Sequence, residues 1–563
     1  MLYDGRGTAR PPNVDPLPPI PEEGENDCKN DDQEDEKCDF LFAVRGNAHE
    51  YLLKIRSDAP KNFEEAIRHD HYADAIEVEL SALEANKTWK IVKKGPGMQI
   101  LNSLWIFNAK RRKDGSIERY KARLVGDGRR RYGVNFSDRY APTVRASTIR
   151  MLLAIAVRLG MTLRQCDVNN AYLHGSLTNP VYMRIPKGRQ HLYDPHRYCC
   201  QVLKGIYGLP ESGKVWNDEF DRTMLRLGYK RSVSDPCLYY KGSIADRTLE
   251  LVTVYVDDVI IATFDGNTKL IDTLREKYGV KNDGPLDYVL GVAMDQSPNK
   301  ITLNQEKYID DVLRRFDMQD CKGVSTPLNS SLKITKTGDG VPADKSLYQS
   351  IIGSIAYAMT WTRPDLAYSV SKLSRYLNEP TRQHMNQAKH VLRYLKKTKK
   401  YKLTYRRGTQ GLEGYTDADF AGCLDTRKST SGCVITIDGN AVIWKARRQS
   451  VPVKSSAAAE YIALAEATDE VLWARGLLRE LGFNLGTTTM HEDNQATIKI
   501  GENQILSERT KSLDITYHRV RHYVQNKIIK LQYVSTEEQM ADILTKAAPK
   551  AKYDDFAAQH YSV

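Results

Sequence analysis

Two adjacent carboxylates, Asp257 and Asp258, stand between the runs Leu249–Val256 and Val259–Phe264, which are rich in β-branched residues. Such runs predict strands, and the two residues between them predict a hairpin with both acids in its turn. Neighbouring carboxylates that lose water repel each other unless a cation neutralises them. A solvated turn is the commoner explanation of an isolated Asp-Asp pair. The pair becomes a candidate site for divalent cations only if further acids join it.

The candidate third acid is Asp167, which ends a short predicted strand in the stretch Met161–Gly175. The aromatic residue Tyr172 follows it five positions later. A single Asp after a strand is usually a helix cap, so its assignment to a cation site depends on the surrounding motifs.

The second half of the chain carries four more acids, each at a predicted strand or helix. A capping residue or an exposed helix face would explain each acid taken alone. Residues 536–539 (TEEQ) resemble a capping box and predict the start of a helix. The four acids are Asp417 in a strand, Glu460 early in a helix capped by Ser455 or Ser456, Asp493 at a strand end, and Asp542 in the helix after residue 539.

The elements that would hold these residues alternate between helical and strand periodicity. Helices are predicted over 62–88, 147–159 with Ser147 as N-cap, 304–316 and 387–400. Residues 104–128 predict a hairpin about Asp114-Gly115 whose cations could cover a triphosphate or a nucleic acid backbone, although a solvated hairpin fits equally well. The cations of this hairpin are Lys110, Arg111, Arg112, Lys113, Arg119, Lys121 and Arg123.

Length and charge limit the classes of protein to consider. A chain of 563 residues is too long for one core and predicts two to four domains. The net charge is +12, but residues 22–39 carry −8, which leaves +20 on the rest. A basic surplus of this size indicates a polyanionic partner. The first 40 or so residues are Pro-rich and then acidic, a composition typical of disorder.

The nine Cys residues are scattered without a CxxC pair, and Cys199 and Cys200 are adjacent, which is poor spacing for a metal site. A reduced intracellular protein is therefore expected. No apolar run is long enough to span a membrane, and the first residues lack a signal-peptide pattern.

A series of motifs follows in one order along the chain: RYKARLV (119–125), YAPTVR (140–145), 167–175, GIYG (205–208), YVDD (255–258), GSIAYAMTWTRPD (353–365), GYTDADFAGCLDTRK (414–428), 455–461 and 541–546. On these motifs, the chain resembles the reverse transcriptase and ribonuclease H region of Ty1/copia-type retrotransposon Pol polyproteins from about residue 62 to 546.

The resemblance implies a multidomain α+β and α/β fold. It implies a right-hand polymerase with fingers, palm and thumb, followed by a ribonuclease H-like mixed sheet with helices. The predicted parts are a linker (1–45), polymerase (46–330), connection (331–410), ribonuclease H-like domain (411–546) and tail (547–563).

The same resemblance implies roles for individual residues. Two Mg²⁺ ions would be held by Asp167, Asp257 and Asp258, with Asp258 the less certain ligand because neighbours on an extended chain point apart. Two more would be held by the four later acids, Asp417, Glu460, Asp493 and Asp542. Tyr172 would be the steric gate that excludes a 2′-hydroxyl. The remaining implied residues are Lys121 and Arg123 at the triphosphate, Gly208 at the nucleotide loop, and His518 assisting product release.

The implied partners are an RNA template, a DNA primer and product, the RNA–DNA hybrid and dNTPs, with no membrane and no motif for an oligomeric state. The family implies a cytoplasmic virus-like particle or the nucleus. Two departures from the family pattern stand out, Pro210-Glu211 in the loop after Tyr207-Gly208 and Ser512 where a His is usual. They keep open an inactive or domesticated nucleic-acid-binding remnant, and ribonuclease H activity alone is a third reading.

Overall fold

A computed structural model describes residues 59–111, 117–128, 140–502 and 514–563 of the chain. The predicted linker (1–45), the Asp114-Gly115 turn and Ser512 lie outside these ranges. Within them, no helix is both long enough and apolar enough to cross a membrane.

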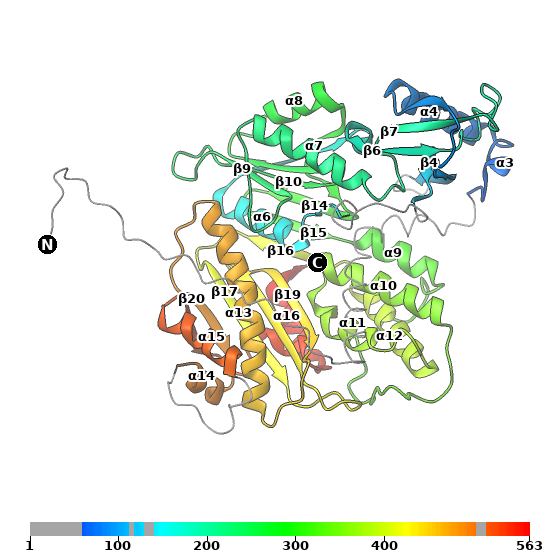
Figure 1. The fold of residues 1–563 in the computed structure, drawn as a ribbon. Coiled ribbons are helices and arrows are strands. Elements are labelled where there is room, and N and C mark those ends of the chain that lie inside the picture. Colours follow the sequence, from blue (N-terminus) through cyan, green and yellow to red (C-terminus); the bar gives the residue numbers. More distant parts are fainter. Residues whose placement is uncertain (1–58, 112–116, 129–139, 503–513) are drawn as a thin grey trace, which may run out of the picture. The chain divides into compact units, whose positions relative to one another are not determined.

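The basic hairpin packs beside a helix in the first part of the fold (Figure 1). The helix predicted over 62–88 is in fact two helices, because the backbone at His69 is extended. The two hairpin strands are confirmed, and helix α4 packs Tyr72 and Leu80 against Phe107 and Ala122. The elements are α3 (Phe63–Ala66), α4 (Asp70–Ala85), β3 (Ser103–Arg111), β4 (Ile117–Gly126), and a sheet of β1 (Trp89–Lys93), β7 (Tyr198–Lys204), β6 (Ser176–Met183) and β2 (Ile100–Leu101).

A six-stranded sheet with the order β12-β5-β11-β10-β9-β8 carries the first group of acids. Its central strands are almost wholly buried, as expected for strands covered on both faces. The strands are β5 (Thr162–Val168), β8 (Lys230–Arg231), β9 (Leu238–Lys241), β10 (Glu250–Tyr255), β11 (Asp258–Thr263) and β12 (Val280–Pro285). The helices of this part are α6 (Ala146–Leu159), α7 (Ser212–Arg226) and α8 (Lys269–Tyr278), with the short 3-10 helix η3 (Ala171–His174).

Helix α6 begins earlier than predicted and is capped from outside. Its N-cap is Arg145, so the prediction of Ser147 as cap was wrong. The carboxylate of Asp235 accepts from the Arg145 backbone N–H at 3.0 Å and from the Thr148 hydroxyl at 2.5 Å. An anion at this end also complements the helix dipole. Asp235, which is far away in the sequence, therefore caps α6 in place of the predicted local cap.

The region around residue 330 is structurally continuous. Strands β14 and β15 precede it and β16 follows it, yet all three belong to one five-stranded sheet, and helix α9 packs on α12. The amphipathic helix predicted over 304–316 is α9, and the basic helix over 387–400 is the second half of α12. The elements are β13 (Tyr288–Val289), β14 (Val292–Ser297), β15 (Lys300–Asn304), β16 (Lys402–Arg406), β22 (Tyr561–Ser562), α9 (Glu306–Arg315), α10 (Lys345–Trp361), η4 (Pro364–Leu366), α11 (Ala367–Ser374) and α12 (Arg382–Thr398).

A second mixed sheet, with the order β19-β18-β17-β20-β21, carries the later acids. Strand β17 pairs antiparallel with β18 and parallel with β20, and the long helix α13 packs across it (Figure 1). Asp438 and Gly439, both with positive φ, make the predicted tight turn before β19. The elements are β17 (Leu412–Asp419), β18 (Thr430–Ile437), β19 (Asn440–Arg448), α13 (Ser456–Glu480), β20 (Thr488–Glu492), α14 (Gln495–Glu502), α15 (Asp514–Gln525), β21 (Ile529–Tyr533), η6 (Met540–Leu544) and α16 (Lys550–His560).

Helix α13 also contacts the loop between β8 and β9. Its Glu480 carboxylate accepts from the Ser232 hydroxyl at 2.6 Å and from the backbone N–H of Ser234 at 3.0 Å. The Trp473 indole donates to the Ser234 carbonyl at 3.0 Å. The two sheets are therefore joined by satisfied hydrogen bonds as well as by apolar packing.

Candidate active sites

The first group of acids meets at one end of the six-stranded sheet. Asp167, near the end of β5, is the register partner of Asp258, the first residue of β11. Asp257 lies in the turn just before β11. The predicted convergence of acids about 90 residues apart in the sequence is therefore present.

The turn lies one residue earlier than predicted. Tyr255 pairs with Asp258, so Val256 and Asp257, not Asp257 and Asp258, form the turn. Val256 has φ 57, a left-handed conformation that is strained for a β-branched residue. The Trp216 indole donates to the Val256 carbonyl at 2.6 Å, and the Val168 N–H donates to the Asp257 carbonyl at 2.8 Å. These two anchors hold the strained turn.

Burial and mutual repulsion make it unfavourable for the three carboxylates to be ionised together without a cation. Burial, reinforced by the charges of Asp257 and Asp167, raises the pKa of Asp258 to about 8. Burial, followed by the charge of Asp167, also raises the pKa of Asp257. A divalent cation would relieve both penalties, which is the chemistry expected of a metal site.

Lys281 and Asn282 of β12 were missed by sequence reasoning. The Lys281 ammonium lies 2.9 Å from Oδ1 of Asp167, and the Asn282 amide donates to Oδ2 at 3.2 Å. Lys281 is brought there because β12 pairs with β5, opposite Asp167. No local signal could have found it, since the contact depends on strand pairing.

The predicted gate and triphosphate residues lie together. Tyr172, in η3, packs edge-on against Tyr207 with ring centroids 4.9 Å apart. The Arg123 guanidinium lies 4.2 Å from the centroid of the Tyr207 ring. Burial, then repulsion from Arg123 and other cations, lowers the pKa of Lys121 to about 8, while the charge of Asp257 opposes that shift. The charge of Lys121 on the basic hairpin therefore interacts with the charge of Asp257 in the carboxylate group.

Gly208 is required by packing inside the protein. Its φ is 87, and an added Cβ would lie 2.2 Å from the Gly126 carbonyl oxygen of strand β4. The Gly126 N–H donates to the Tyr207 carbonyl at 2.8 Å. Glu211, which departs from the family pattern, stands at the N-cap of α7 with a buried side chain that makes no capping hydrogen bond to this helix.

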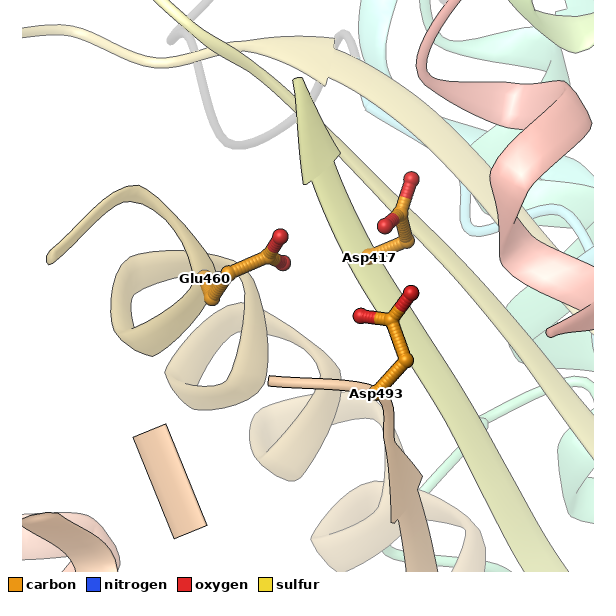
Figure 2. A group of neighbouring side chains, drawn as sticks. All are labelled: Asp417, Glu460 and Asp493. Carbon is orange, nitrogen blue, oxygen red and sulfur yellow. The ribbon is translucent and has the colours of Figure 1, made fainter. Parts of the chain in front are cut away.

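The second group is tighter, and Figure 2 shows its three side chains pointing toward one another. Asp417, Glu460 and Asp493 each offer a carboxylate oxygen, and these atoms lie within 4.8 Å of one another. Among the described residues, no other set of His, Cys, Asp or Glu meets that criterion for a metal site. The acids of the first site are less tightly grouped, and Asp167 pairs with Lys281 instead.

Three elements position these acids. Asp417 is on the central strand β17, and its Oδ2 accepts from the Thr545 hydroxyl at 2.5 Å. Glu460 is in the second turn of α13, whose cap is Ser455 rather than Ser456. Asp493 directly follows β20, and its Oδ2 accepts from the Thr536 hydroxyl at 2.8 Å. The predicted strand, helix and strand-end placements are all present.

The charge balance at this site also calls for a cation. Burial, then the charges of Asp417, Glu492 and Asp493, raises the pKa of Glu460 to about 10. Burial raises the pKa of Asp417 to about 6, against the Thr545 hydrogen bond. Among the described residues, the buried Oε2 atom of Glu460 has no hydrogen-bond partner. An unsatisfied buried carboxylate oxygen fits a metal ligand.

Asp542 stands apart from this cluster. It lies in the 3-10 helix η6, and its carboxylate pairs with Lys546 and lies 3.8 Å from the Lys552 ammonium. The capping box predicted at 536–539 was wrong, because the Ser535 hydroxyl, one residue earlier, makes the turn with Glu538. Asp542 still lies close enough to Asp417 to raise the pKa of Asp417.

Glu492 was not predicted from the sequence, whereas His518 was. Glu492 is fully buried at the end of β20, and burial raises the pKa of its carboxyl. An acid at a buried strand position, directly before Asp493, was the available signal. His518 is on α15, but its side chain is outside the described part of the chain.

Known proteins are similar to this chain over the region that contains both groups of acids. A reverse transcriptase (RNA-dependent DNA polymerase) family model matches residues 86–330. The retrovirus-related Pol polyprotein from transposon TNT 1-94 of Nicotiana tabacum is 35% identical over 519 residues, which is 90% of this chain and 39% of that protein. The corresponding polyprotein from transposon RE2 of Arabidopsis thaliana is 34% identical over 90% of the chain and 35% of its own length.

A shorter relative is matched throughout. The putative transposon Ty5-1 protein of Saccharomyces cerevisiae is 33% identical over 313 residues, 54% of this chain and 100% of that protein. Among solved structures, a foamy viral protease–reverse transcriptase gives a TM-score of 0.46 at 11% identity, covering 90% of this chain and 80% of its own. The chain thus spans little more than a third of the two longer polyproteins. It belongs to the reverse transcriptase family of copia-type retrotransposon Pol polyproteins.

Proposed function

We propose that the chain is an RNA-directed DNA polymerase that also degrades the RNA strand of RNA–DNA hybrids. The observation that carries the proposal is the presence of two separate carboxylate groups in one folded unit, each with raised pKa values. A hybrid-cutting nuclease is useful to a polymerase that makes DNA on RNA. An RNA template, a DNA primer and dNTPs are therefore the substrates.

At the polymerase site, Asp167 and Asp257 would hold Mg²⁺, with Asp258 beside them. Mg²⁺ bound by these carboxylates would supply a lowered pKa of the primer 3′-hydroxyl and charge stabilisation of the departing pyrophosphate. Lys121 and Arg123 provide cations for the triphosphate. The Tyr172 ring, braced by Tyr207, excludes a 2′-hydroxyl from the sugar pocket. Lys121, Arg123 and Tyr172 thus bind and orient the nucleotide. The carboxylates of Asp167, Asp257 and Asp258 would balance the charge of the bound Mg²⁺.

At the nuclease site, Asp417, Glu460 and Asp493 would hold Mg²⁺, which supplies an activated water and stabilises the leaving 3′-oxygen. The grouping of their oxygens within 4.8 Å and the unsatisfied Glu460 oxygen fit this metal. Thr545 and Thr536 orient Asp417 and Asp493 by hydrogen bonds. Asp542, held by Lys546, contributes negative charge from the side of the site.

Two matched variants test the assignment. Asp257→Asn should abolish primer extension on poly(rA)/oligo(dT) with Mg²⁺ while hybrid cleavage continues. Glu460→Gln should do the reverse, lowering hybrid cleavage by about 10²-fold or more, as expected when a metal ligand worth several kcal/mol is lost. Each variant is the folding control for the other.

The alternative outcomes are distinct. Folded wild-type protein that binds hybrid but shows neither activity would establish an inactive nucleic-acid-binding remnant. Hybrid cleavage that survives Asp257→Asn, in a wild-type protein without primer extension, would leave ribonuclease H activity alone. Loss of both activities in either single variant would contradict the assignment of two independent sites.

A further inference from the structure

A buried arginine joins the polymerase part, meaning α6 with the six-stranded sheet, to the nuclease part, meaning the second mixed sheet with α13. Arg150 lies in α6 and is only 5% exposed. Its Nε donates to the Val442 carbonyl of β19 at 2.8 Å, and a terminal nitrogen donates to the Thr360 carbonyl of α10. The guanidinium carbon also lies 3.8 Å from the centroid of the Trp444 ring, a favourable cation–π distance.

This cation has no counter-charge. Burial lowers the pKa of Arg150 to about 10, so the side chain is still charged at neutral pH. Among the described residues, no carboxylate pairs with it. A buried charge without an opposite charge is costly unless polar groups are placed to receive it. The guanidinium is therefore stable only while Val442, Thr360 and Trp444 keep their positions.

The end of helix α10 is satisfied from both parts. The last carbonyls of a helix have no partner within the helix, and a cation is favoured beside them. The Thr360 carbonyl accepts from Arg150 of the polymerase part. The Met359 carbonyl accepts from the Trp444 indole of the nuclease part at 3.0 Å. A displacement of either part would leave one of these carbonyls without its donor.

A second contact holds the other end of α6. Arg158, eight residues after Arg150 and so ~12 Å along the helix, pairs with Asp438 at 2.8 Å. Asp438 lies in the turn between β18 and β19, and its side chain is 1% exposed. Two separated contacts resist rotation of the nuclease part about either one alone.

These contacts lie between the two groups of acids. Helix α6 is followed after two residues by β5, which carries Asp167. On the other side, Trp444 is the register partner of Val434 of β18. Val434 in turn pairs with Tyr415 of β17, two residues before Asp417. Arg150 therefore lies on a continuous series of packed elements that leads from one carboxylate group to the other.

We propose that Arg150 is a positioning residue that keeps the nuclease site in register with the polymerase site on one hybrid, and so sets where the RNA is cut relative to the primer 3′ end. This inference rests on the proposed polymerase and nuclease functions. Coupling between two sites requires a shared element that both depend on, and the three-way contact at Arg150 is such an element. Without it each site still reacts, but the nuclease part moves relative to the polymerase part and the cut positions spread.

Mapping the cuts in a labelled RNA template tests the positioning role. The primer is extended to a known stop by withholding one dNTP, and the cuts are measured from its 3′ end. In Arg150→Met the ratio of cuts outside the main position to cuts at that position should rise by about 2- to 30-fold, while the rates of nucleotide addition and of total hybrid cleavage stay within about threefold. Arg150→Lys keeps a cation for the Thr360 carbonyl and should give an intermediate ratio.

A matched control and a milder variant complete the test. Arg226→Met removes an exposed arginine whose Nε donates within its own helix, and it should leave the cut pattern unchanged. Trp444→Phe keeps a ring beneath Arg150 but loses the hydrogen bond to Met359, so it should spread the cuts even if Arg150→Met does not fold. Circular dichroism checks the fold of each variant.

The outcomes separate the inference from the proposed function. Scattered cuts in the wild type, or an unchanged cut pattern in folded Arg150→Met and Trp444→Phe, would overturn the positioning role while both activities stand. Lower rates with an unchanged cut pattern would also overturn it, because Arg150 would then only stabilise the fold. If the wild-type protein neither extends a primer nor cleaves hybrid, the proposed function fails and the positioning role fails with it.

Discussion

Lys281 holds its ammonium nitrogen 2.9 Å from Oδ1 of Asp167, across the pairing of β12 with β5. The Asp167 side chain is only 17% exposed. A fixed cation therefore neutralises a carboxylate that we assign to metal binding. Without metal this pair stabilises the site, and a metal ion bound there would compete with Lys281 for the same oxygen.

The first prediction concerns this competition. Lys281→Met should increase the affinity of the metal-free polymerase site for Mn²⁺ several-fold, because the competing charge is gone. The same change should lower the free energy of unfolding in EDTA by about 1 kcal/mol, the upper end of the range for an ion pair whose cation is partly exposed. Mn²⁺ binding by electron paramagnetic resonance and urea unfolding measure the two effects. The control is Lys307→Met. Among the described residues, the Lys307 ammonium contacts the Tyr288 ring and no carboxylate. Unchanged Mn²⁺ affinity would rule out the competition.

The second prediction concerns the contact between the basic hairpin and the nucleotide loop. Gly208→Ala places a methyl group 2.2 Å from the Gly126 carbonyl oxygen at a positive φ, so it should destabilise the protein by at least about 2 kcal/mol. Gly353 lies inside helix α10, and no described atom lies within 4 Å of an added Cβ, apart from its chain neighbours and the backbone of its own helix. Gly353→Ala should therefore instead stabilise the protein by up to about 1 kcal/mol. Urea unfolding measures both. Similar effects of the two changes would refute the close approach.

The third prediction concerns the buried pair within the TWTRPD stretch. Arg363 and Asp365 are fully buried and joined by two hydrogen bonds, at 2.7 and 3.0 Å. Tyr394 and Tyr561 also donate to the Asp365 carboxylate. Asp365→Asn should cost about 3–5 kcal/mol, because it leaves a buried guanidinium without its counter-charge. Asp311→Asn, which breaks an exposed pair with Arg314, should cost less than about 1 kcal/mol.

The fourth prediction concerns pH and metal removal. In the metal-free protein the pKa of Asp417 is about 6 and that of Glu460 about 10, whereas unfolded carboxyls titrate near 4. At these two carboxyls the folded chain thus binds more protons than the unfolded chain between about pH 4 and 10. The free energy of unfolding contributed by these acids is fully present below about pH 4 and is lost as the pH rises.

Thermal unfolding in EDTA measures this dependence. Relative to Glu460→Gln, whose side chain does not titrate, the unfolding temperature of the wild type should fall from about pH 5 to about pH 9. Excess Mg²⁺ should raise the unfolding temperature most at high pH, where the carboxylates bind metal without losing a proton. An unfolding temperature that rises with pH in EDTA, to the same extent in wild type and variant, would contradict the raised pKa values.

Local patterns predicted the elements well wherever periodicity is strong. The strands β3 and β4, the amphipathic helix α9 and the Ser455-capped helix α13 follow from residue spacing and caps. One error arose where a distant residue replaces a local signal, and the others arose from small shifts within a turn or a helix. Asp235 caps α6 in place of Ser147, and the pairing of Tyr255 with Asp258 moves the turn to Val256 and Asp257.

The sequence by itself determined which acids were available and in what order along strands and helices, because side-chain chemistry and the 2- and 3.6-residue periods are local properties. Only the tertiary structure decided which of them meet. Asp417, Glu460 and Asp493 share one small volume, while Asp542 turns to Lys546 and Asp167 to Lys281. The meeting of Asp417, Glu460 and Asp493 and the pairing of Asp167 with Lys281 depend on strand pairing and helix packing across 30 to more than 100 residues, where no short pattern carries the information.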